Sequence, residues 1–163
     1  MRTPANIAGH PIHPMLVTIP IGLWIFSLVA DFMALRSAAP ETWAAVALYT
    51  MVGGIVGALA AALPGLVDLL SLKDDAIKKT ALVHMGLNLT IVALYVINAW
   101  MRWGQTTVGG TPLILSVVAI AMLVVSGWLG GKMVYLGQVG VTTDAPTTTS
   151  TASTSTQQTR RPV

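Results

Sequence analysis

Long apolar stretches alternate with short polar segments along the chain, and this pattern predicts the secondary structure. Four stretches are long enough to cross a bilayer core about 30 Å thick, which takes roughly 20 helical residues. Each predicts a transmembrane helix, and the four helices are expected at residues 15–35, 43–66, 80–101 and 112–134. These runs are continuously apolar, whereas the strands of a membrane barrel alternate between apolar and polar residues. The pattern therefore predicts an all-α, integral membrane four-helix bundle.

The composition agrees with a membrane protein and excludes several kinds of site. Hydrophobic residues make up 54% of the chain and charged residues 9%, and the mean hydropathy is +0.73. The first apolar stretch is longer than the core of a signal peptide, and no small-residue cleavage motif follows it, so we expect it to remain as a helix. The chain has no cysteine, which excludes disulfides, thiolate metal sites and cysteine-held iron–sulfur clusters.

Lysine and arginine predict the orientation of the helices, because short loops rich in these residues stay on the cytoplasmic side. With the N-terminus inside, the outer loops hold only Arg36 and Arg102, whereas the inner segments hold Arg2, Lys73, Lys78, Lys79, Lys132, Arg160 and Arg161. Both termini are therefore predicted to be cytoplasmic. The net charge of +3 is expected to meet anionic lipid headgroups; no basic stripe interleaved with aromatic residues suggests a nucleic-acid partner.

The chain is expected to contain one folded unit and one tail. Residues 1–141 form the predicted transmembrane domain. Residues 142–163 are a low-complexity Thr/Ser tract with little apolar surface to bury, which predicts a disordered cytoplasmic tail. No soluble segment is large enough for an independent active site, and no hydrolase or phosphate-loop motif occurs. No catalytic residue is therefore predicted.

Two of the predicted helices carry a stripe of residues spaced alternately four and three apart, the period of one face in a left-handed bundle. The stripe on the third helix is polar and consists of His84, Asn88, Ile91, Tyr95, Asn98 and Arg102. The stripe on the first consists of His13, Val17, Pro20, Trp24, Ser27 and Asp31. Because ionisable groups avoid lipid, we expect the stripes to face each other or a shared cavity. Asp31 is expected to pair with Arg36 or Arg102, or to accept a hydrogen bond from Asn98.

Small residues recur every four positions along the second predicted helix. One lane consists of Gly53, Gly57, Ala61 and Gly65, and its neighbour of Gly54, Ala58 and Ala62; the fourth helix has a similar group at Ser126, Gly127, Gly130 and Gly131. Such spacing lets helix backbones approach closely in lipid. These residues predict tight packing and no chemistry.

The segment GHPIHP places two of the three histidines, His10 and His13, before the first helix. Pro14 suits the first helical position, so His13 is expected at the mouth of the helix and His10 just outside it. His84 lies about one turn into the third helix, and Asp68 just past the predicted end of the second. All four groups are expected in one cytoplasmic layer.

Such a layer is compatible with three kinds of chemistry, and also with a purely structural role. Imidazoles from two helices ligate haem iron, which would use His84 and one of His13 or His10 to hold haem b. The metal alternative is a divalent cation held by His10, His13, His84 and Asp68. Proton or ion handling is the third. In the remaining interpretation, the first two histidines cap a helix and His84 bonds helix to helix.

Four segments resemble the prokaryotic membrane proteins grouped as domain of unknown function 2231. They are GHPIHPMLVTIPIGLWIFSLVAD (9–31), LPGLVDLLSL (63–72), ALVHMGLN (81–88) and GGKMVYLGQVGV (130–141). The resemblance implies a four-helix protein of the prokaryotic inner membrane, joined in some members to a Rieske iron–sulfur domain, which suggests redox work. Many relatives carry a further histidine where this chain has Thr18. Comparing MLVTIPIGL (15–23) with ALVHMGLNL (81–89) places Thr18 opposite His84. Either His13 or His10 would then have to supply the second haem ligand, or no haem is bound.

Three functions follow as hypotheses. The first is a redox component that binds haem b or a metal and meets a redox partner. The second is a structural or accessory membrane protein without a cofactor, in which the small-residue lanes drive packing or formation of a homo-oligomer. The third is transport of metal ions or protons.

Overall fold

Four helices in the computed structural model, which describes residues 3–141, are long and apolar enough to cross a membrane. The first span is the pair of short helices α1 (Ile12–Leu16) and α2 (Thr18–Ala34); the others are α3 (Pro40–Ser71), α4 (Asp75–Arg102) and α5 (Gly110–Tyr135). The predicted all-α class and the four spans are confirmed. The predicted tail, residues 142–163, lies outside the described residues.

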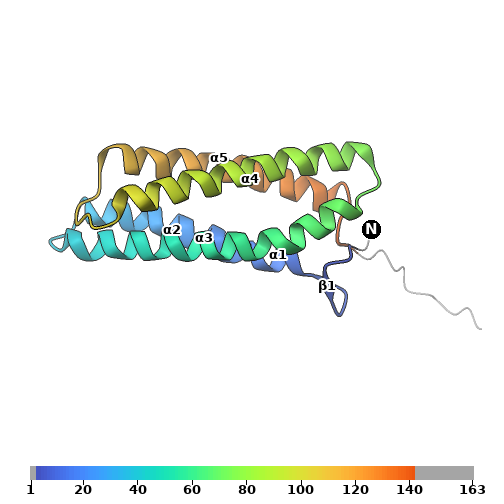
Figure 1. Ribbon diagram of the computed structural model, residues 1–163, viewed down its shortest axis with the longest axis horizontal. Coiled ribbons are helices and arrows are strands. Elements are labelled where there is room, and N and C mark those ends of the chain that lie inside the picture. The colour runs from blue at the N-terminus through green and yellow to red at the C-terminus, as the bar shows by residue number, and fades with distance from the viewer. Residues whose placement is uncertain (1–2, 142–163) are drawn as a thin grey trace, which may run out of the picture.

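The helices form two antiparallel hairpins, α2 with α3 and α4 with α5, that lie side by side along their length (Figure 1). The start of α1, the connection from α3 to α4 and the end of α5 share one end of the bundle. Before α1, β1 (Asn6–Ile7) and β2 (His10–Pro11) form a small antiparallel hairpin in which Asn6 pairs with Pro11 and Ile7 with His10. The arm that carries His10 therefore lies at the same end as the connection from α3 to α4.

Several helices extend past the predicted apolar stretches. The helix α3 has Pro40 in its first turn and continues through Pro64 to Ser71. Asp74 caps α4, because its carboxylate accepts a hydrogen bond from the backbone N–H of Ile77 at 2.9 Å. Hydropathy marks the lipid-facing part of a helix, whereas backbone hydrogen bonds continue into the polar interface, which explains the longer helices.

The first span begins differently from the prediction. Pro14 is not its first helical residue, since α1 starts at Ile12 and places His13 within a helical turn. Pro11 precedes this turn with an extended backbone. His13 therefore projects from a helix, whereas His10 lies in β2.

Small residues on α3 bring α2 close to it, as the sequence predicted. A Cβ atom added to Gly54 would overlap the indole of Trp24, and one added to Gly57 would lie 2.9 Å from Cγ2 of Ile19. The central core holds Trp24, Met51, Ile91, Tyr95, Ala99, Ala119 and Leu123. The close approach of the two backbones therefore places the stripe from His13 to Asp31 inside the bundle.

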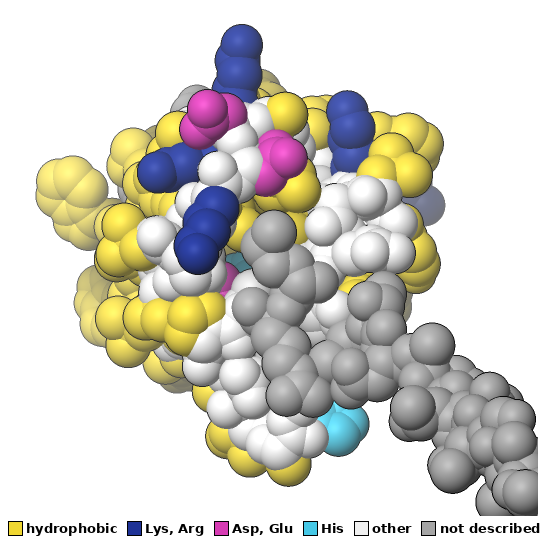
Figure 2. Space-filling view, turned by 90° about the vertical axis from the view of Figure 1, so that its right-hand side faces the viewer, with side chains coloured by type: hydrophobic (Ala, Val, Ile, Leu, Met, Phe, Trp, Pro, Cys, Tyr) yellow, Lys and Arg dark blue, Asp and Glu magenta, His cyan; other side chains and the backbone are white. Residues whose placement is uncertain are grey.

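Aromatic and charged side chains mark the two ends of the bundle. Trp100 and Trp103 are exposed near one end, and Trp128 and Tyr135 near the other. Tryptophan and tyrosine are enriched at both membrane interfaces, so these positions agree with a spanning bundle. Figure 2 looks onto the end that carries the N-terminal arm, where lysine and aspartate side chains gather and hydrophobic side chains form the sides.

Candidate functional site

His13 is fixed against the backbone of α3. Its Nδ1 lies 2.8 Å from the carbonyl oxygen of Ala61, and its ring covers Gly65, where an added Cβ atom would lie 2.7 Å from Nδ1. The side chain is half-buried. The imidazole can therefore reach α3 because position 65 is a glycine.

His84 is held in the same way by α5. Its Nδ1 lies 2.9 Å from the carbonyl oxygen of Ser126, and a Cβ atom on Gly130 would lie 3.3 Å from its Cε1. Asn88 donates to the Ser126 hydroxyl at 2.7 Å and to the His84 carbonyl at 2.8 Å. The predicted helix-to-helix role of His84 is thus present, and Asn88 reinforces it.

Both hydrogen bonds fix the imidazole tautomer. A carbonyl oxygen can only accept, so Nδ1 of a neutral His13 or His84 carries the proton, and the lone pair of Nε2 is left for another partner. Donation from Nδ1–H to a carbonyl is the usual way in which a ligating histidine is oriented.

His10 and Asp68 are engaged separately. The His10 ring is exposed, with Nδ1 3.2 Å from the Ala8 carbonyl oxygen. Asp68 is buried and accepts a hydrogen bond from the Ala5 backbone N–H at 3.0 Å, which ties the N-terminal arm to α3. Within residues 3–141, no group of three or more His, Cys, Asp or Glu side chains could hold a metal ion. The four-ligand set proposed from the sequence is therefore not assembled, because the arm directs His10 outward and occupies Asp68.

Thr18 is not the structural counterpart of His84. Its side chain is exposed, and its hydroxyl donates to the carbonyl of Met15 in the preceding turn at 2.7 Å. His13 instead makes the same contacts as His84, a carbonyl and a glycine four residues apart on the neighbouring helix. The repeat inferred by aligning Thr18 with His84 was out of register.

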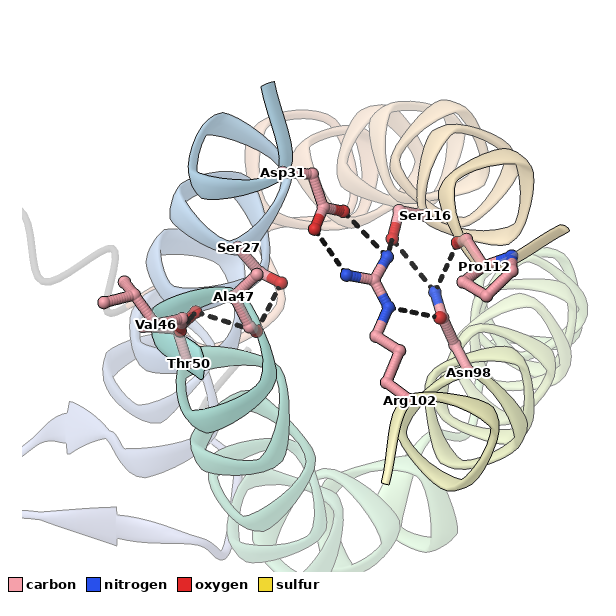
Figure 3. Close-up of polar contacts among 9 residues, drawn as sticks. All are labelled: Ser27, Asp31, Val46, Ala47, Thr50, Asn98, Arg102, Pro112 and Ser116. Carbon is pink, nitrogen blue, oxygen red and sulfur yellow. Dashed lines mark hydrogen bonds and ion pairs between the residues drawn. The ribbon is translucent and has the colours of Figure 1, made fainter. Parts of the chain in front are cut away.

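A network of hydrogen bonds closes the opposite end of the bundle, where α2 and α4 face each other (Figure 3). Both terminal nitrogens of Arg102 bond the Asp31 carboxylate, Nη1 to Oδ1 and Nη2 to Oδ2, the latter at 2.8 Å. Asp31 is fully buried and Arg102 is 5% exposed. Arg36 is exposed. The structure thus selects Arg102 as the partner of Asp31.

Polar side chains around this ion pair complete the network. Asn98 accepts from Arg102 Nε at 2.8 Å and donates to the Pro112 carbonyl at 2.9 Å. The Ser116 hydroxyl accepts from Asn98 at 2.9 Å and from Arg102 Nη2 at 3.1 Å. A buried ion pair is favourable only when such partners satisfy its remaining groups. The network therefore joins α2, α4 and α5 without a buried, unpaired charge.

Stacked rings lie between these two polar layers. Trp24 and Tyr95 have ring centroids 4.4 Å apart and an interplanar angle of 13°. Trp24 Nε1 donates to the Met51 carbonyl at 3.2 Å, and Ser27 donates to the Ala47 carbonyl at 2.8 Å. The buried Tyr95 hydroxyl has no partner among residues 3–141. The two stripes thus face each other as predicted, but their centre is aromatic and separates the polar layers.

Two serines of α5 take part in these layers, although the sequence analysis assigned Ser126 only to close packing and did not identify Ser116. Ser116 bonds the ion-pair network and Ser126 bonds His84 and Asn88; both are buried. They are isolated hydroxyl groups in an apolar run, and such groups need a partner inside the protein when lipid surrounds it. The isolated position of a serine in an apolar run was therefore the sequence signal that could have identified these residues as hydrogen-bonding partners.

A surface groove at the histidine end lies between the start of α4 and the end of α5. Its volume is about 350 Å³, and its lining residues include Asp74, Thr80, Lys132 and Met133 but neither His13 nor His84. Both histidine side chains are half-buried and do not line this groove.

The sequence was compared with known proteins. It matches the model of one family over residues 9–143, and that family is described as a predicted membrane protein, DUF2231. No curated protein and no solved structure matches the chain. The matched region includes all four candidate spans. As the sequence motifs predicted, the chain belongs to the family of predicted membrane proteins with domain of unknown function 2231.

Proposed function

We propose that this protein is a membrane redox component that holds haem b between His13 and His84. The observation that carries the proposal is the matched orientation of the two rings. Each Nδ1 bonds a backbone carbonyl, of Ala61 or Ser126, which leaves both Nε2 atoms as candidate ligands. Two imidazoles from different helices of a four-helix bundle are a common ligand set for haem.

The residues around the two rings fit such a group chemically. No side chain projects from positions 65 and 130, where Gly65 faces the His13 ring and Gly130 faces the His84 ring. The carbonyls of Ala61 and Ser126 hold the rings in one tautomer and increase the basicity of Nε2. Haem bound there would supply one-electron chemistry. His10, exposed on the arm, is not part of this site.

The location and orientation of the protein are part of the proposal. Four exposed lysines, Lys73, Lys78, Lys79 and Lys132, lie at the end that carries His13 and His84. By the positive-inside rule this end faces the cytoplasm, which supports cytoplasmic termini. The resemblance to the family suggests that the membrane is the prokaryotic inner membrane. A soluble redox partner would approach the histidine layer from that side.

An absorption spectrum tests the haem proposal. The protein is purified in mild detergent from haem-supplied cells, and reduced-minus-oxidised spectra are recorded for the wild type, His13→Ala, His84→Ala and the control His10→Ala. We expect a b-type spectrum in the wild type and in His10→Ala, and its loss in the other two variants. Gel filtration of each variant shows whether it remains folded. A flat wild-type spectrum at full haem supply would contradict the proposal.

A second candidate function is a structural or accessory membrane protein without a cofactor. It is favoured by the fact that His13 and His84 already join α1 to α3 and α4 to α5. In that case the wild-type spectrum is flat, and both alanine variants lower the melting temperature in detergent.

A further inference from the structure

The stripe that runs along α1 and α2 and the stripe on α4 follow one register. Asp31 and Arg102 are separated by 71 residues. The same interval separates His13 from His84, Trp24 from Tyr95 and Ser27 from Asn98. Each stripe thus places a histidine at one end, an aromatic ring in the middle and a charged residue at the other end.

The helices α3 and α5 follow a second register. An interval of 65 residues separates Ala47 from Pro112, Ala61 from Ser126 and Gly65 from Gly130. The buried faces agree in the same register, since Met51 corresponds to Ser116 and Gly54 to Ala119, and all four are buried. The interval of 65 residues is six shorter than the interval of 71, so the two helices of the second hairpin are joined by six fewer residues than those of the first.

Hydrogen bonds within the two hairpins repeat in these registers. Ser27 donates to the Ala47 carbonyl at 2.8 Å, and its counterpart Asn98 donates to the Pro112 carbonyl at 2.9 Å. The bond from His13 to the Ala61 carbonyl likewise corresponds to the bond from His84 to the Ser126 carbonyl. Two helical hairpins of unrelated origin would have no reason to share donor, acceptor and register at two separate levels.

Counterparts also meet each other between the hairpins. Trp24 stacks on Tyr95, and Asp31 forms its ion pair with Arg102. Contact between equivalent residues is what a twofold axis produces, because only residues beside the axis touch their own copies. Here the axis runs along the bundle, between α2 and α4, which run in the same direction (Figure 1).

We propose that the chain is a tandem repeat of one helical hairpin, and that the stripe on each hairpin is a pairing surface for the other. The partner that fits the stripe on α2 is therefore a second copy of the same hairpin, carrying the opposite charge at the position of Asp31. This proposal does not depend on haem.

The charge at the axis explains why the two copies differ. In two identical hairpins, two aspartates or two arginines would meet at this buried position, and like charges there are strongly unfavourable. An aspartate in one copy and an arginine in the other turn the same contact into a hydrogen-bonded pair. Asn98 and Ser116 then satisfy the remaining donors of Arg102. The ion pair thus favours pairing between the two different hairpins and disfavours pairing between two identical ones.

Exchanging the network between the hairpins tests the repeat in the full chain. The exchange variant carries Ser27→Asn, Asp31→Arg and Met51→Ser in the first hairpin, and Asn98→Ser, Arg102→Asp and Ser116→Met in the second. The matched controls, Asp31→Arg alone and Arg102→Asp alone, place like charges on the axis. We expect each control to lower the melting temperature in detergent by more than about 10 °C and the exchange variant to lie within about 5 °C of wild type.

A second exchange involves neutral groups only, so that one poorly folded variant does not decide the outcome. It moves the bond between Asn88 and Ser126 to the first hairpin through Val17→Asn, Ala61→Ser, Asn88→Val and Ser126→Ala. The half-exchange, with the last two changes alone, should melt lower than wild type, and the full exchange should recover most of that loss. Recovery in either exchange supports the repeat; failure of both to melt higher than their controls would overturn it.

Discussion

Trp24 and Tyr95 stack at the centre of the bundle, with ring centroids 4.4 Å apart and an interplanar angle of 13°. The contact joins α2 to α4 and therefore one hairpin to the other. Both side chains are almost fully buried, Trp24 at 2% and Tyr95 at 0% exposed. Aromatic pairs of this kind add about 0.5–1.5 kcal/mol beyond the area that they bury. The stack is thus a central apolar contact between the two polar layers.

Removal of the Tyr95 hydroxyl should not weaken the fold. This hydroxyl is buried without a partner among residues 3–141, and such a group costs about 1–3 kcal/mol. Tyr95→Phe keeps the ring and removes this cost, so we expect an unchanged or higher melting temperature in detergent. Ser116→Ala is the contrasting control, because it removes a bonded hydroxyl and should lower the melting temperature. A clear loss in Tyr95→Phe would show that the hydroxyl has a partner.

Removal of one member of the buried ion pair should cost far more than removal of both. Asp31→Leu leaves Arg102 buried without its counter-ion, and Arg102→Met does the same to Asp31. Each single change should lower the free energy of unfolding by about 3–5 kcal/mol. The double variant Asp31→Leu/Arg102→Met contains no buried charge, and we expect it to be more stable than either single variant.

The measurement for the ion pair is a double-mutant cycle of unfolding in mild detergent. Arg36→Met is a suitable control, because Arg36 is exposed near the same end of the bundle. Strictly additive losses in the cycle would mean that Asp31 and Arg102 do not stabilise each other.

Glycine substitutions should discriminate between the two histidine contacts. A Cβ atom at Gly65 would lie 2.7 Å from His13 Nδ1, whereas one at Gly130 would lie 3.3 Å from His84 Cε1. Gly65→Ala should therefore destabilise the protein more than Gly130→Ala, by about 1–3 kcal/mol for such overpacking. Gly127→Ala is the matched control, since nothing lies within 4 Å of its added Cβ. Thermal unfolding of the three variants checks this order, and equal losses at all three positions would contradict it.

Asp68 should hold the N-terminal arm against α3. Its carboxylate accepts a hydrogen bond from the Ala5 backbone N–H at 3.0 Å. Asp68→Ala removes the acceptor and should increase hydrogen exchange at Ala5 several-fold, because a bond worth about 1 kcal/mol is lost. Asp68→Asn keeps an acceptor oxygen and should remain close to wild type. Equal exchange in the alanine variant and the wild type would show that the arm is held by other contacts.

The sequence alone determined the spans and the faces that meet inside the bundle. Continuous apolar runs can satisfy their backbone only as helices in lipid, so length and hydropathy were sufficient to find four of them. The spacing of Trp24 and Tyr95 placed each on a stripe, and the avoidance of lipid by ionisable groups predicted that the stripes would face each other or a shared cavity. Arg102, the partner of Asp31, was also among the predicted alternatives, because few cationic residues lie near that end of the bundle.

The tertiary structure decided which polar groups are partners, because one sequence pattern allows several. Hydropathy placed His10, His13, His84 and Asp68 at one end, yet the arm turns His10 outward and uses Asp68 for its own backbone. Thr18 appeared opposite His84 in the sequence, but its hydroxyl donates to the carbonyl of Met15 in the preceding turn. The correspondence of His13 with His84 depends on bonds to carbonyls 48 and 42 residues away, and no local pattern specifies them. Helix formation in lipid is a property of each segment, whereas pairing is a property of two surfaces that only folding brings together.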